Sequence, residues 1–192
     1  LLVILFGAYV RVTGSGAGCG NHWPLCQGKL IPHSLLTKTL IELTHRLSSG
    51  LLFVFSAFIL YLIQKKLKAH RLLLRIARLS FFFLILEALL GAGLVLLEHV
   101  ADNRSNYRAF SMSLHLINTF LLTGTSLLAW LLSREKFLKA QFVWQKNWSP
   151  KLLFGIFLFF FLSISGAITA LGDTLFPIST HKEALLQSLD FK

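Results

Sequence analysis

Long apolar stretches constrain this chain more than any other feature. Four of them, at about 39–63, 76–97, 111–132 and 152–171, are each long enough to cross a hydrocarbon core of ~30 Å as a helix. Charged residues make up only 14% of the chain, well below the roughly 25% of an ordinary soluble domain. We therefore predict an all-α, polytopic membrane helix bundle.

A fifth, shorter apolar stretch opens the sequence and runs from Leu1 to Val10. As a helix it would span about 15 Å, which is half of the hydrocarbon thickness. Because the chain begins without Met, we expect this first helix to have lost its beginning, and no signal peptide can be recognised in what remains. The expected total is five helices, the first of them truncated.

Basic residues indicate the orientation of the bundle. Eleven of them cluster in two short connections, 64–78 and 134–151, whereas the other three connections hold seven over a longer total length. The positive-inside rule makes the first two connections cytoplasmic. The net charge of +11 could suggest nucleic acid, but these residues lie between apolar runs and not on one solvated face. We therefore predict no nucleic-acid partner.

Cys19 and Cys26 are the only cysteines, and both fall in the first outer connection. An oxidising compartment allows a disulfide to persist there, which agrees with the orientation given by the basic residues. The alternative is a zinc site that adds His22, but it has no fourth ligand nearby. We expect this loop to lie outside a bacterial plasma membrane.

A short internal similarity suggests a repeat. Gly7-Ala8-Tyr9-Val10 leads the first helix into its outer loop, and Gly166-Ala167-Ile168-Thr169 does the same for the fifth. A repeated four-helix unit would produce this pattern. We predict a first four-helix half at 1–133, a cytoplasmic linker at 134–151 and the start of a second half at 152–192. The whole would be an eight-helix tandem repeat.

Two histidines lie at matched depth within the apolar segments. His45 is seven residues inside Lys38 and His115 is seven residues inside Arg108, which places both imidazoles about 10 Å from the outer boundary. In an up-and-down bundle their helices can face each other. This geometry suits a haem iron bound by both histidines. The alternative is that each one only bonds a neighbouring helix.

Other polar residues accompany these candidate ligands. Glu42 precedes His45 by one helical turn and is expected to orient the imidazole or to act on the bound group, unless it only reaches outward to water. Arg11 and Arg46 are candidates for pairing with haem propionates.

The third and fourth apolar stretches add three more polar side chains. Glu87 lies in the middle of the third, and we expect it to bond a neighbouring helix and not to take part in catalysis. Asn118 and Thr119, on the face of His115, are expected to bond a substrate group or each other.

In order along the chain, several motifs resemble those of the haem A synthase family. They are Val10-Arg11-Val12-Thr13-Gly14-Ser15-Gly16, Cys19, Trp23-Pro24-Leu25-Cys26-Gln27-Gly28, Glu42-Leu43-Thr44-His45-Arg46 and His115-Leu116, with Ala170-Leu171-Gly172-Asp173-Thr174-Leu175-Phe176-Pro177 similar to the fifth-helix exit of some members. The resemblance implies two four-helix halves, of which the first receives haem O as substrate and the second carries a bis-histidine haem b. It also implies an oxidoreductase that converts a methyl group of haem O to a formyl group, giving haem A for terminal oxidases.

The resemblance also implies roles for individual residues. His45 and His115 would flank the substrate haem, Glu42 would take part in catalysis, and Cys19 with Cys26 would form a loop disulfide. The implied partners are the lipid bilayer, a haem O synthase and electron acceptors. The chain alone is expected to be inactive. The alternatives are a bis-histidine cytochrome b for electron transfer and a transporter or haem exporter.

Overall fold

The fold is known from a computed structural model that describes residues 1–33, 36–66, 70–100, 103, 105–134 and 150–175. Within α6, side chains are described for 150, 153–166 and 169. The described residues form five helices: α1 (Leu2–Val12), α2 (Thr37–Lys66), α3 (Arg71–Leu96), α4 (Asn106–Leu132) and α6 (Pro150–Leu175). The predicted all-α class and the five helices are confirmed.

The long helices extend beyond their apolar stretches. Three of them, α2, α3 and α4, are long and apolar enough to cross a membrane, as judged by length and composition. Lys65 and Lys66 prolong α2, and Arg71 and Arg75 prolong α3, because Lys and Arg favour a helix almost as well as Leu does. The predicted connection 64–78 is therefore largely helical where it is described.

The remaining two helices offer shorter apolar stretches. Helix α1 has 11 residues, and the apolar part of α6 with described side chains is Leu153–Gly166. Helix α6 begins at Pro150, in agreement with the preference for proline in a first helical turn. Helix α4 begins after Ser105, whose hydroxyl accepts a hydrogen bond from the Arg108 N–H.

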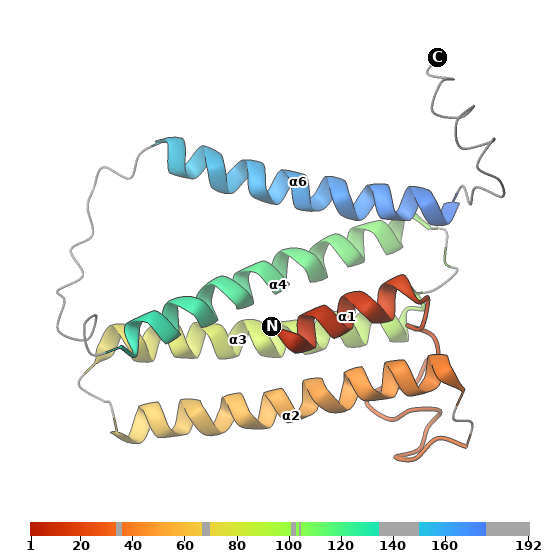
Figure 1. The fold of residues 1–192 in the computed structure, drawn as a ribbon, viewed down its shortest axis with the longest axis horizontal. Helices are drawn as coiled ribbons and strands as arrows, with labels where there is room; N and C mark the ends of the chain where they lie inside the picture. The colour runs from red at the N-terminus through yellow and green to blue at the C-terminus, as the bar shows by residue number, and fades with distance from the viewer. Residues whose placement is uncertain (34–35, 67–69, 101–102, 104, 135–149, 176–192) are drawn as a thin grey trace.

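The helices run up and down side by side (Figure 1). Helix α3 packs on α2 and α4, α4 packs on α6, and α1 packs on α2; the contact between α3 and α4 is the most extensive. Helices α1 and α3 end where α2 and α4 begin, at the right of Figure 1. We call this the loop end of the bundle, since the connection between α1 and α2 also lies there.

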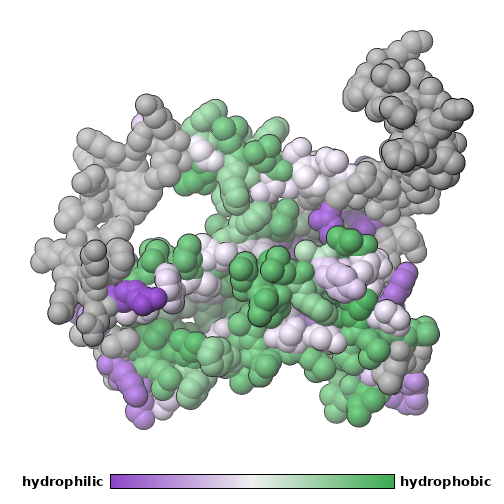
Figure 2. All heavy atoms as spheres, viewed as in Figure 1, coloured by the Kyte–Doolittle hydropathy of each residue, from purple (hydrophilic) through white to green (hydrophobic). Residues whose placement is uncertain are grey.

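The surface of the bundle is apolar along its middle. In Figure 2 hydrophobic residues cover the central part of the visible face, and the hydrophilic ones gather toward the two ends. Large apolar side chains on α2 are exposed, for example Leu51 (72%) and Val54 (65%). Such a surface is unfavourable in water but suits contact with lipid tails. The fold is a membrane helix bundle.

Two parts of the predicted organisation lie outside the described residues. These are 135–149, which make up most of the predicted linker, and 176–192, which end the predicted second half. The domain division and the tandem repeat therefore stay predictions.

Candidate functional site

A disulfide closes the loop between α1 and α2. Cys19 and Cys26 are bonded, with alpha-carbons 4.5 Å apart and both residues buried. The Gln27 N–H donates to the Cys19 carbonyl oxygen at 2.9 Å and secures the same turn. The predicted bridge is confirmed, and it leaves no thiolate for the alternative zinc site. We call residues 18–27 the disulfide loop.

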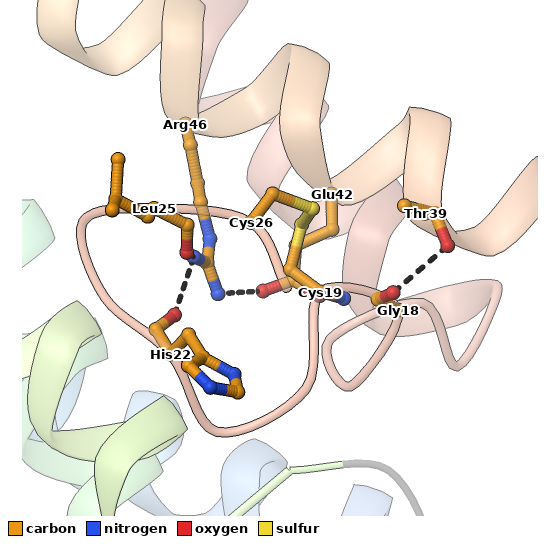
Figure 3. The surroundings of a disulfide bond; sticks show 8 residues. All are labelled: Gly18, Cys19, His22, Leu25, Cys26, Thr39, Glu42 and Arg46. Carbon is orange, nitrogen blue, oxygen red and sulfur yellow. Dashed lines mark hydrogen bonds and ion pairs between the residues drawn. A yellow bond between two sulfur atoms is a disulfide. The ribbon is translucent and has the colours of Figure 1, made fainter. Parts of the chain in front are cut away.

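The disulfide loop is docked on the first turns of α2 (Figure 3). The Thr39 hydroxyl donates to the Gly18 carbonyl oxygen at 2.8 Å. A Cβ at Gly18 would come within 2.4 Å of the Lys38 carbonyl oxygen, so a larger residue cannot approach α2 this closely. The Glu42 carboxylate accepts a hydrogen bond from the Cys19 N–H at 2.8 Å in a buried position.

Arg46 completes this docking from the next turn of α2. Its guanidinium forms an ion pair with Glu42 and donates to the carbonyl oxygens of His22 (2.6 Å) and Leu25 (2.7 Å) (Figure 3). The sequence analysis proposes Arg46 as a partner for a haem propionate and does not include its ion pair with Glu42. The spacing of four residues, with Glu first, is a signal that could have found it.

Arg46 and Arg11 therefore differ as candidates for propionate binding. The guanidinium of Arg46 already has three partners, and its role toward a propionate stays a prediction. Arg11 lies half-buried in the last turn of α1. None of the described residues bonds its guanidinium.

His45 lies one turn deeper than Glu42 and packs against α1. Its ring centroid is 6.2 Å from that of Phe6. A Cβ added at Gly7 would come within 3.0 Å of its Cε1 atom, so the imidazole fills the space that glycine leaves. Its Nδ1 is buried, and no described residue offers it a hydrogen bond.

His115 is held between α4 and α3 in a similar way. Gly91 faces it, with a hypothetical Cβ 3.6 Å from the His115 Cε1. Its Nε2 lies 3.6 Å from a Glu87 oxygen, and its Nδ1 is buried without a partner among the described residues. Each candidate ligand therefore lies against a neighbouring helix.

Glu87 connects α3 to α4, as predicted. It accepts a hydrogen bond from the Asn118 amide at 2.6 Å and another from the Thr119 hydroxyl. The Asn118 amide also donates to the Phe83 carbonyl oxygen at 2.9 Å. The sequence predicts that Asn118 and Thr119 bond a substrate group or each other, and in the structure both bond Glu87.

The two unpartnered imidazole nitrogens determine what this arrangement can bind. Leaving a buried polar atom unsatisfied costs about 1–3 kcal/mol, whereas coordination to a metal would use its lone pair. No group of three or more His, Cys, Asp or Glu side chains that could hold a bare metal ion occurs in the described part of the chain. Two imidazoles are nevertheless sufficient for a haem iron, whose porphyrin supplies the other ligands.

Comparisons with known proteins match this chain to one protein family and to relatives named for haem synthesis. The family model COX15-CtaA, described as "Cytochrome oxidase assembly protein", matches residues 1–188. A "Protoheme IX farnesyltransferase" of Thermus thermophilus is 47% identical over 191 residues, which are 98% of this chain and 31% of the relative. A "Heme A synthase" of Bacillus cereus is 46% identical over 95 residues, 50% of this chain and 30% of that protein.

The matched residues thus cover less than a third of the length of these relatives. No solved structure matches it.

Proposed function

The chain belongs to the COX15-CtaA family of cytochrome oxidase assembly proteins, and from this premise we propose that it is the substrate-binding part of a haem A synthase. The enzyme would oxidise a methyl group of haem O to the formyl group of haem A, which serves terminal oxidases. The finding that a Bacillus cereus relative is named "Heme A synthase" supports the proposal.

One observation carries this proposal. His45 and His115, on α2 and α4, each have a buried nitrogen that no described residue satisfies. A haem iron accepts one nitrogen from each side. In this proposal the two histidines hold haem O between them, near the loop end of the bundle.

The other polar residues would prepare the site. Glu42 and Arg46 hold the disulfide loop on α2 one turn from His45, which would help to exclude water from the bound haem. Arg11 is the better placed of the two candidates to meet a propionate, because the guanidinium of Arg46 is already bonded to the loop.

The proposed reaction needs partners beyond these residues. Converting a methyl to a formyl group with oxygen from water releases four electrons and four protons, of which two protons come from the methyl group and two from the water. Haem b in the predicted second four-helix half would carry those electrons toward an acceptor. A haem O synthase would supply the substrate.

The loop end is proposed to face the outside of the cell. The disulfide between Cys19 and Cys26 is a bond that persists in an oxidising compartment. The Lys and Arg residues at the opposite ends of α2 and α3, such as Lys65, Lys66 and Arg71, suit the cytoplasmic side.

Product analysis tests the function. The full-length protein that contains this chain would be incubated in membranes with haem O, and the extracted porphyrins identified by mass. We expect a formyl product from the parent protein and none from His115→Ala. Unchanged haem O together with bis-histidine electron transfer would favour a cytochrome b, which is the alternative function.

The Thermus relative is named for a farnesyl transfer, so a second incubation tests for that activity. Supplying protohaem and farnesyl diphosphate instead of haem O would reveal a farnesyl transfer. Because the match covers only 31% of that relative, we expect no farnesylated haem from this part of the protein. A farnesylated product that disappears in His115→Ala would overturn the proposal.

A further inference from the structure

Glu87 is a carboxylate at membrane depth to which the proposed reaction assigns no role. A charged or strongly polar group there costs several kcal/mol unless it has partners. All of its described partners lie on α4, toward which both of its oxygens point: one accepts from Asn118 and the other lies 3.6 Å from the His115 Nε2. The side chain is largely shielded, with 18% of its surface exposed.

The two ring nitrogens of His115 have different surroundings. Nε2 faces the Glu87 carboxylate, and Nδ1 is buried with no partner among the described residues. Histidines that bind metals commonly use one ring nitrogen for the metal and direct the other at a carboxylate or carbonyl oxygen. The distance of 3.6 Å exceeds a hydrogen bond, so a small rotation of the imidazole would be needed to form one.

Thr119, one turn after His115, faces the same carboxylate. Its hydroxyl donates to Glu87 and lies 2.9 Å from the His115 carbonyl oxygen, which competes for the same proton. The His115 ring and the Thr119 hydroxyl therefore both face the Glu87 side chain on α3.

His45 has no equivalent arrangement among the described residues. The carboxylate nearest to it along α2, Glu42, is already bonded to the Cys19 N–H and to Arg46. The position of the His45 ring instead follows from packing on Phe6 and Gly7.

We infer that Glu87 is a positioning residue for His115, which orients the imidazole toward the iron of the bound haem. The inference rests on the proposed function, because it requires His115 to be an iron ligand. The contact between α3 and α4 would then orient the His115 imidazole as well as hold the two helices together.

The test compares haem release from variants of the full-length protein. Glu87→Gln keeps the shape and the hydrogen-bonding reach of the side chain, so the tie between α3 and α4 can persist, but it removes the carboxylate. The protein would be loaded with haem O, and transfer to excess apomyoglobin would be followed by absorption. We expect release about 10- to 100-fold faster than from the parent, with a smaller low-spin fraction, as is usual when the carboxylate partner of a ligand is lost.

Ser80→Ala is the matched control. The Ser80 hydroxyl bonds Ser126 at 2.8 Å across the same α3–α4 contact, two turns from Glu87. Its loss should leave haem release and the spectrum as in the parent. If Glu87 only ties the helices together, Glu87→Gln will behave like Ser80→Ala and the inference is wrong.

Two further variants complete the test. His115→Ala must accelerate release; if it does not, the proposed function fails and not only the role of Glu87. Should Glu87→Gln not fold, Glu87→Asp keeps the charge but draws the carboxylate away from His115. It should also release haem faster than the parent, and a parental rate would overturn the inference.

Discussion

Glycine at position 7 sets how closely α1 can approach the His45 imidazole. A Cβ there would lie 3.0 Å from the His45 Cε1, whereas one at Gly91 would lie 3.6 Å from the His115 Cε1. The first distance requires one of the two groups to move, and the second is an ordinary van der Waals contact. The two glycines therefore differ in how strictly they are required.

The glycines give a graded prediction. Gly7→Ala should displace the His45 ring and weaken haem O binding by at least about 10-fold, as displacement of a ligand does. Gly91→Ala should have little effect. Gly93→Ala, with open space around the added methyl group, is the control and should bind haem O like the parent. Titration monitored by absorption checks all three, and equal affinities for Gly7→Ala and Gly93→Ala would contradict the packing described here.

Glu42 and Arg46 form a network with the disulfide loop, and their contributions should be coupled. We expect Glu42→Gln and Arg46→Gln each to loosen the loop, measured as faster hydrogen exchange at the Cys19 amide. The double variant should fall short of the sum of the two effects by about 0.5–3 kcal/mol.

A direct role of Glu42 in the chemistry would give a different pattern. Glu42→Gln would then lower formyl formation by about 100-fold or more with the loop still protected, and Arg46→Gln would not. Measuring exchange and turnover on the same preparations separates the two roles.

At the scale of the elements, the disulfide loop packs closely on α2 and is hydrogen-bonded to it. The closest approach between them is at Gly18, where a Cβ would meet the Lys38 carbonyl oxygen at 2.4 Å. We expect Gly18→Ala to push the loop off α2 at a cost of about 1–3 kcal/mol, as overpacking does, with the disulfide intact. Limited proteolysis of the loop provides the measurement.

Gly16→Ala is the control for this variant. Its added methyl group would lie 3.4 Å from side-chain atoms of Val100 and not from backbone. A loop in Gly18→Ala that resists protease as well as the loop in Gly16→Ala would contradict the docking.

The helices could be predicted from the sequence, and most contacts between them could not. Apolar length fixes a membrane helix because the bilayer leaves backbone groups no other partners, so α2, α3 and α4 were found. Their ends were missed because Lys and Arg continue a helix past the apolar stretch. The sequence also predicts the disulfide, because an oxidising compartment allows it to persist. It predicts the link from Glu87 to another helix as well, because a carboxylate at membrane depth needs a partner.

The contacts that shape the site depend on tertiary structure. The hydrogen bond from Cys19 to Glu42 joins residues 23 positions apart, and no periodicity in the sequence encodes that pairing. The packing of His45 on Gly7 likewise requires the position of α1 on α2. Matched depth predicts His45 and His115 as candidate ligands, but it does not reveal the carboxylate beside His115.

At the scale of the whole molecule, the bundle has one end with the disulfide loop and one end rich in Lys and Arg. The proposed orientation predicts that a cysteine at Leu30, in the exposed loop, reacts with a membrane-impermeant maleimide on intact cells. A cysteine at Lys66, at the end of α2, should react only after the cells are opened. The reverse pattern would show that the loop end faces the cytoplasm.

The central claim is that His45 and His115 together bind the iron of haem O, and ligand replacement tests it most directly. Haem O would be titrated into the full-length parent protein and into His45→Ala, His115→Ala and His99→Ala, with affinity and low-spin signal read by absorption and electron paramagnetic resonance. His99 is the control, since it bonds Ser111 at 2.8 Å outside the site. We predict that each of the first two variants loses the low-spin signal of haem O and binds it at least about 100-fold more weakly, while His99→Ala matches the parent. Parental affinity and spectrum in either His45→Ala or His115→Ala would contradict the account.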